Sequence, residues 1–268
     1  MWRFVALFVA LVAGVTAAVW YYRFTPTAAP VSVVVRNDDR WLDQLQSRSP
    51  KDVEAATAAL EQRGTAALPA IRGALQDPAA DPARRRAALK AAAILGPRAV
   101  ECLPEVTSAL QDPQLAPEAG LALSFMGSAA VDTLRGALNS DEPVVRREAL
   151  RALGKLRERA SIDPQIVVPL LLKSLDDPDA AVRQVATTYL GIVRDRPAEG
   201  VEGLIRALQD ADADVREAAA LALSSYGLDA EPAIPALTKA SKDPDEDVQR
   251  EAARTLVHIS ELKSKTNP

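Results

Sequence analysis

The side chains that most often carry out catalysis are scarce in this sequence, which holds one histidine, His258, and one cysteine, Cys102. One imidazole cannot form a metal site by itself, and a catalytic base needs a positioned partner. We therefore interpret His258 as a surface or end-cap residue. Cys102 has no second cysteine to pair with and no basic cluster beside it to activate the thiol, so we expect a small buried apolar side chain.

The short motifs of common enzyme classes are also missing from the sequence. No G-x-x-x-x-G-K phosphate loop and no G-x-S-x-G nucleophile elbow occurs. Carboxylates are plentiful, but they fall where helices are expected to start, and there they accept hydrogen bonds from free N–H groups. We interpret them as helix caps rather than as acid–base pairs. The prediction is a protein that is not an enzyme and has no catalytic residue, metal or cofactor.

A basic stripe is the main candidate for binding. Val145, Ala149 and Leu153 recur at four-residue steps and are expected to face a helical core, so positions two residues further on point away from it by about 200°. In helical solenoids the second helix of each pair usually lines the concave side. The outward positions are Arg147, Arg151 and Lys155, and in later copies Gln184, Thr188, Glu217, Leu221, Arg250, Arg254 and His258. This pattern predicts a groove that binds a protein partner, namely an acidic peptide or protein. The alternative is a solvated charged face with Glu148 and Glu251 nearby.

These positions are defined by an internal repeat that fills residues 41–262. Asp177, Asp210 and Asp243 are each 33 residues apart, and each is followed by Val, Ala and Leu at four-residue steps. Such steps place three side chains along one stripe of a helix. Shorter or weaker copies begin at Asp52, Asp77, Asp112 and Asp141.

Each copy also predicts a partner helix. A glycine at 64, 96, 127 or 227 ends one helix, and an apolar segment with a proline in its first turn follows, as at 68–75 and 103–110. One such pair cannot bury its own apolar stripe, so stacked pairs should share a continuous core.

The pattern D-P-x-x-x-V-R-x-x-A-x-x-x-L is similar to HEAT repeats, particularly the short bacterial type first associated with phycobilisome lyase subunits. The resemblance covers roughly residues 50–262. It implies an all-α fold, namely an α-solenoid with a right-handed superhelix of about six to seven helix pairs. It also implies a ladder of Asp and Arg side chains that bond from repeat to repeat, with Asp177, Arg183, Asp210 and Arg216 at the family spacing. Asp141 and Arg146 are one residue closer together, and Gln249 replaces Arg in the last copy.

The N-terminal residues predict a membrane anchor. Residues 4–22 form a run of nineteen without a charge, bracketed by Arg3 and Arg23 and flanked by aromatic residues. A cleaved signal peptide is the alternative. We therefore divide the chain into a transmembrane helix at 1–23, a proline-containing linker at 24–40 and a repeat domain at 41–268. We expect the repeat domain to lie outside the cytoplasm.

Charge argues against a nucleic-acid partner. Without the four Arg and two Asp of residues 1–40, the chain's 32 basic and 36 acidic residues leave a net charge of −6 for the repeats. Proteins that neutralise many phosphates usually carry a basic excess. We therefore expect a membrane-anchored scaffold that binds a protein partner, with no nucleic acid or small-molecule substrate. The alternative is a lyase-like or chaperone-like accessory factor that acts on a partner protein.

Overall fold

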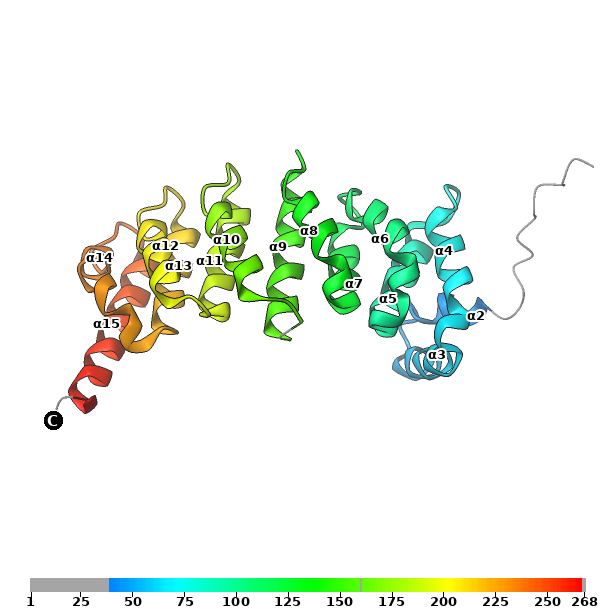
Figure 1. Ribbon diagram of the computed structural model, residues 1–268, viewed down its shortest axis with the longest axis horizontal. Coiled ribbons are helices and arrows are strands. Elements are labelled where there is room, and N and C mark those ends of the chain that lie inside the picture. The colour runs from blue at the N-terminus through cyan, green and yellow to red at the C-terminus, as the bar shows by residue number, and fades with distance from the viewer. Residues whose placement is uncertain (1–38, 160, 267–268) are drawn as a thin grey trace, which may run out of the picture. The chain divides into compact units, whose positions relative to one another are not determined.

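The computed structural model describes residues 39–159 and 161–266, and a compact unit begins at Arg40. All regular structure in these residues is helical (Figure 1). Two helices, α2 (Arg40–Gln44) and α3 (Pro50–Arg63), precede six helical hairpins. The hairpins pair α4 (Leu68–Gln76) with α5 (Pro82–Leu95), α6 (Leu103–Leu110) with α7 (Ala116–Met126), α8 (Val131–Ala137) with α9 (Pro143–Glu158), α10 (Pro164–Ser174) with α11 (Ala180–Val193), α12 (Pro197–Ala207) with α13 (Ala213–Ser224), and α14 (Ile234–Ala240) with α15 (Glu246–Thr266).

Among helices that follow one another in the chain, the closest pairs meet across the Asp-containing loops. The copies read from the sequence begin at each Asp, but the helix before that Asp packs more closely on the Asp-led helix than the helix after it does. The repeating unit of the structure is therefore a short apolar helix, an Asp loop and a longer Val-Ala-Leu helix. These loops lie along the upper edge of the stack in Figure 1.

Local sequence explains where these helices begin and end. The side chains of Asp179 and Asp212 accept backbone N–H bonds at the starts of α11 and α13. Short 3₁₀ segments join several hairpins, as at Gly96–Cys102 and Gly227–Ala233. Gly96 and Gly227 begin these segments with φ of 56° and 57°, a backbone region that favours glycine.

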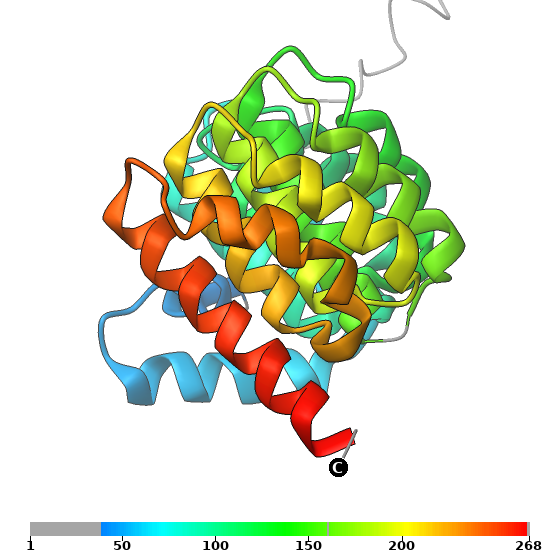
Figure 2. The same cartoon turned by 90° about the vertical axis from the view of Figure 1, so that its left-hand side faces the viewer.

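The hairpins stack as two rows of helices, and an end-on view shows them superposed behind α15 (Figure 2). We call α5, α7, α9, α11, α13 and α15 the inner row and the other six the outer row. Successive inner-row helices contact each other extensively, whereas successive outer-row helices touch only sparsely. The inner row therefore lies on the inside of the curve.

The Val-Ala-Leu stripe forms the core between the two rows. Val215, Ala219 and Leu223 are fully buried, as are their counterparts in α9 and α11. Each hairpin shares these contacts with its neighbours, as expected for a stack in which no unit can bury its stripe alone.

Two glycines allow the inner row to pack tightly. A Cβ at Gly154 would lie 2.0 Å from the Tyr189 ring, and one at Gly191 would lie 2.7 Å from the Cβ of Ala222. These helices can approach each other closely because no side chain stands between them.

Within the described residues no helix is both long enough and apolar enough to cross a bilayer. The span predicted at 4–22 lies outside those residues, as does the predicted linker at 24–40 apart from its last two positions.

Candidate functional site

Three arginine–aspartate pairs join consecutive hairpins along the loop edge of the stack. One edge of each guanidinium takes part, because Nε and Nη2 of each arginine donate to the two carboxylate oxygens of the next loop. The N···O distances are 2.7–2.8 Å for Arg146 with Asp177, and 2.8 Å for Arg183 with Asp210 and for Arg216 with Asp243. We call these pairs the ladder.

The ladder also fixes the loops from which it starts. Nη1 of Arg183 donates to the carbonyl oxygens of Asp177 and Pro178, and each ladder aspartate accepts a backbone N–H two residues further on. The loops at Asp177 and Asp210 are each held by one arginine from either side. This is a structural role for Asp177, Arg183, Asp210 and Arg216.

Charge pairing stabilises the ionised aspartates. Burial opposes the ionisation of Asp177 and Asp210, but hydrogen bonds from the ladder arginines and from a backbone N–H outweigh it and lower the pKa of both carboxyls. The hydrogen bond from Arg216 is the main cause of the lowered pKa of Asp243. All three pairs are therefore ionised at neutral pH.

The ladder is confined to the C-terminal half of the stack among the residues that the structure describes. Each ladder arginine follows the first core position of its helix, and in α7 this place is taken by Ala116. Arg85 occupies that position in α5, but it donates to the carbonyl oxygen of Asp77 and its buried Nε has no partner. Gln249 likewise bonds the carbonyl oxygen of Asp243 at the C-terminal end. The departures of sequence from the family pattern at Arg146 and Gln249 thus have different outcomes, since Arg146 forms a complete pair.

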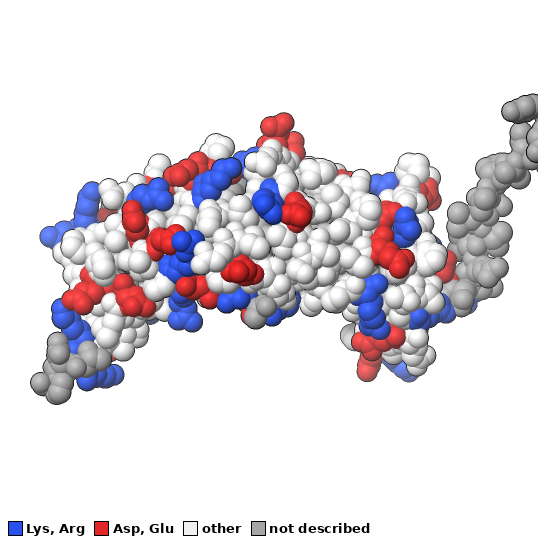
Figure 3. Space-filling view, viewed as in Figure 1, with Lys and Arg blue, Asp and Glu red and all other residues white. Residues whose placement is uncertain are grey.

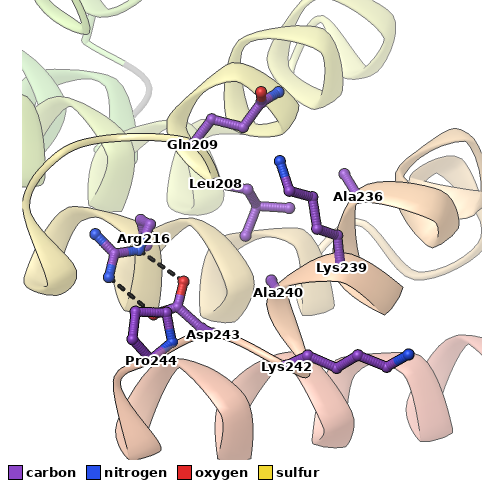
Figure 4. A pocket seen from close by; sticks show the side chains of 9 residues that line it. All are labelled: Leu208, Gln209, Arg216, Ala236, Lys239, Ala240, Lys242, Asp243 and Pro244. Carbon is purple, nitrogen blue, oxygen red and sulfur yellow. Dashed lines mark hydrogen bonds and ion pairs between the residues drawn. The ribbon is translucent and has the colours of Figure 1, made fainter.

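Hollows flank the ladder positions. One of about 410 Å³ lies between α12, α13 and α14, and Figure 4 shows Arg216 turned onto Asp243 at one end of it, with Lys239 extending beside Leu208. A hollow of about 270 Å³ occupies the equivalent place beside Arg85. The charges that line the larger hollow include a ladder pair that is already satisfied, so we assign this hollow to the framework.

The outward positions of the inner row form a continuous surface that we call the inner face. They stand two, six and ten residues after the first core position of each helix. Arg151, Thr188, Leu221, Arg250, Arg254 and His258 are exposed there, and Arg147, Lys155, Gln184 and Glu217 are half-buried. The structure therefore brings all the predicted partner-binding residues onto one face.

A basic cluster on α9, formed by Arg147, Arg151 and Lys155, occupies the middle of the inner face. Glu148 is buried beneath it and accepts hydrogen bonds from Arg151 Nη1 at 2.8 Å and from Arg147 Nε at 3.2 Å. Glu148 therefore lies near the basic residues, as in the alternative interpretation of a solvated charged face, but its own side chain is buried. One buried carboxylate balances two arginines, and Lys155 adds a further positive charge.

Large apolar side chains lie on the same face beside the basic cluster. Leu121 and Phe125 on α7 are 41% and 39% exposed, Ile192 on α11 is 42% exposed and Leu221 on α13 is 57% exposed. Arg159 lies 4.1 Å above the Phe125 ring, a favourable cation–π distance. Sequence reasoning named Leu221 but missed the other three, although each stands six or ten residues after the first core position of its helix.

The residues that could do chemistry lie apart from one another. Cys102 is fully buried, and burial raises the pKa of its thiol to about 11. His258 is exposed on the last helix. No group of three or more His, Cys, Asp or Glu side chains suited to a metal occurs in the part of the chain that the structure describes.

On the face shown in Figure 3, acidic and basic side chains are interspersed over the C-terminal half, and uncharged residues prevail around α6 and α7. No large patch of one sign forms on that face.

Comparison with known proteins identifies the class. The model of the family described as HEAT repeats matches residues 103–164 and 168–257, more than half of the chain. The chain therefore belongs to the HEAT-repeat family. No curated protein sequence matches it.

Solved structures agree on the fold. Kap95p, solved in work on its binding to RanGDP, is 15% identical over 85% of this chain, with a TM-score of 0.65. Kap121p is 15% identical over 84% of this chain, with a TM-score of 0.60. The matched region spans 34% of the Kap95p chain and 29% of the Kap121p chain, so this chain corresponds to about a third of such a solenoid.

Proposed function

We propose that this HEAT-repeat protein is a non-enzymatic scaffold that binds another protein on its inner face. The observation that carries the proposal is the row of exposed Leu121, Phe125, Ile192 and Leu221 beside the α9 basic cluster. Single exposed apolar residues are ordinary, but several on one face with charged residues beside them are typical of an interaction surface.

The apolar part of this pattern is not needed by the core. The core between the rows is complete without the four apolar residues, and the loops are held by the ladder on another edge of the stack. The shared fold with Kap95p, whose structure concerns binding to RanGDP, supports protein binding as the use of such a surface.

We further propose that residues 4–22 anchor the scaffold in a membrane and that the repeats lie outside the cytoplasm. The support is the uncharged run of nineteen residues with Trp and Tyr at its ends. Anchoring would raise the local concentration of the inner face at the bilayer and so favour partners in or near that membrane.

Site-specific photo-crosslinking in intact membranes tests the binding surface. A photoreactive amino acid replaces Thr188 on the inner face or, as the matched control, Thr238 on α14. Both threonines are exposed, and both bond the carbonyl oxygen four residues earlier in their own helix. We expect discrete crosslinked products from position 188 and few from position 238. Equal yields from both positions, or a preference for position 238, would contradict the proposed surface.

Membrane fractionation tests the anchor. The full chain should remain in the pellet after carbonate extraction, whereas a chain that begins at residue 24 should be released. Protease that reaches the outer side of an intact cytoplasmic membrane should digest the repeats. Release of the full chain by carbonate would refute the anchor, and protection from protease would reverse its orientation.

A further inference from the structure

The outward positions of the inner row are richer in basic residues than the repeats as a whole, although each of their arginines pairs with a carboxylate beside it. Residues 41–268 carry a net charge of −6, yet the outward positions of α5 to α15 hold seven basic residues and one acidic residue, Glu217. The basic residues are Arg86, Lys90, Arg147, Arg151, Lys155, Arg250 and Arg254. A surface so biased within an acidic domain favours a negatively charged occupant.

The positive charge is not distributed evenly along the stack. From α7 to α11 the outward positions change from apolar Leu121 and Phe125 to basic Arg151 and Lys155 and back to apolar Ile192, whereas α5 before them carries Arg86 and Lys90. An occupant complementary to this order has acidic residues in its middle and apolar residues on both sides.

The dimensions of the face favour an extended chain over a helix. These residues occupy two outward positions on each helix, six and ten residues after the first core position. The two positions are four residues apart, or about 6 Å along the helix. An extended strand is about 5 Å wide, whereas a helix with side chains is about 10 Å wide. Neighbouring packed helices lie about 9 Å apart, which about three extended residues span.

We infer that the inner face binds an extended protein segment in which an acidic residue lies about three positions from an apolar residue on each side. The apolar residues contact Leu121 and Phe125 at one end and Ile192 at the other, and the acidic residue pairs with Arg151 and Lys155. This inference rests on the proposed function and adds to it the chemistry and the spacing of the partner.

Fluorescence anisotropy with synthetic peptides tests the inference on the full chain in detergent micelles. The probe peptide has leucine about three residues before and after a central pair of glutamates, with serine and glycine elsewhere. The comparison peptide has the same composition with both leucines at one end. We expect the spaced peptide to bind at least about tenfold more tightly, because two apolar contacts and one charge pair form together.

Variants of the scaffold locate the contact. Lys155→Glu should weaken binding about tenfold and should restore binding of a peptide with lysines in its centre, since the charge pair is then reversed. Ile192→Ser should also weaken the original peptide. Lys173→Glu and Ile166→Ser on α10 are the matched controls, because both residues are exposed on the outer row; neither should change affinity. Melting temperatures of all four variants establish that the stack is intact.

Several results would overturn the inference. Equal affinity for the spaced peptide and the comparison peptide contradicts the pattern of contacts. An affinity that Lys155→Glu leaves unchanged contradicts it as well. Tighter binding of a labelled single-stranded oligonucleotide than of the peptide would identify a nucleic acid as the occupant. If crosslinks form at position 188 but none of the acidic peptides binds, the proposed function stands and only this inference fails.

Discussion

Removal of Asp210 should cost the protein far more stability than removal of an exposed aspartate. Asp210→Ala leaves Arg183 with no carboxylate, although the two side chains are only 11% and 15% exposed. Breaking a fully buried pair in this way costs about 3–5 kcal/mol. Because water still reaches part of this pair, we expect about 2–3 kcal/mol. The same change at Asp132, whose partner is Arg135 and whose side chain is 90% exposed, should cost less than about 0.5 kcal/mol.

Urea unfolding followed by far-UV circular dichroism measures the difference. With an m-value of about 3 kcal/mol/M, Asp210→Ala should lower the midpoint by about 0.7–1 M and Asp132→Ala by less than about 0.2 M. The double variant Arg183→Met with Asp210→Ala should recover part of the loss, because it removes the unpaired charge. Equal midpoint shifts for Asp210→Ala and Asp132→Ala would refute the structural role of the ladder. So would a double variant whose loss of stability equals the sum of the losses in Arg183→Met alone and Asp210→Ala alone.

Three further outcomes are expected. Gly191→Ala should lower the melting temperature by several degrees, because its Cβ would lie 2.7 Å from that of Ala222, whereas Gly136→Ala, with no atom within 4 Å, should leave the temperature unchanged or raise it slightly. Cys102 should resist iodoacetamide in the folded protein at about pH 8 and react fully in urea, since burial raises the pKa of its thiol to about 11; fast labelling of the folded protein would contradict this. The ladder aspartates have a lower pKa in the folded than in the unfolded chain, so their contribution to stability is complete above about pH 4 and is lost as the pH falls further. Unfolding midpoints between about pH 6 and pH 2 should show this loss in the natural protein, with a smaller decrease in Asp210→Ala.

Periodicity predicted the helical rows well because burial recurs at the same positions in every copy. Val215, Ala219 and Leu223 are all buried where the four-residue steps place them. Leu256 at the end of the last stripe is only partly buried. The sequence pattern is the same there, but burial depends on the neighbouring helices as well as on the residue itself.

The ion pairs between hairpins were harder to predict. Asp177 and Arg183 stand in the same copy of the repeat, but in the structure Arg183 forms its ion pair with Asp210 of the next hairpin. The resemblance to HEAT repeats implied such bonds between repeats, whereas periodicity within a copy carries no information about which neighbours meet. Arg85 shows the same limit, because it stands at the ladder position of its helix and yet bonds the carbonyl oxygen of Asp77.

The apolar residues of the inner face were missed for two reasons. Leu121 and Phe125 lie in an irregular copy, and Ile192 stands one turn beyond Gln184 and Thr188, the two outward positions read from its copy. Asp112 precedes the first core position, Leu115, by three residues, whereas Asp177 precedes Val182 by five. The irregular spacing hides the outward positions of α7, so the pattern does not single out Phe125 and Leu121.

The uneven ladder gives the two halves of the stack different stiffness. From α9 to α15 each hairpin is clamped to the next by a two-bonded ion pair, so bending there must stretch charge-assisted bonds. Between α5 and α9 no such two-bonded pair occurs among the described residues; the hairpins there are joined by single bonds, as from Arg72 to Glu105 and from Arg159 to the carbonyl oxygen of Ser124. We therefore expect a pulling or bending force on this solenoid to deform mainly its N-terminal hairpins, while the C-terminal hairpins keep their curvature.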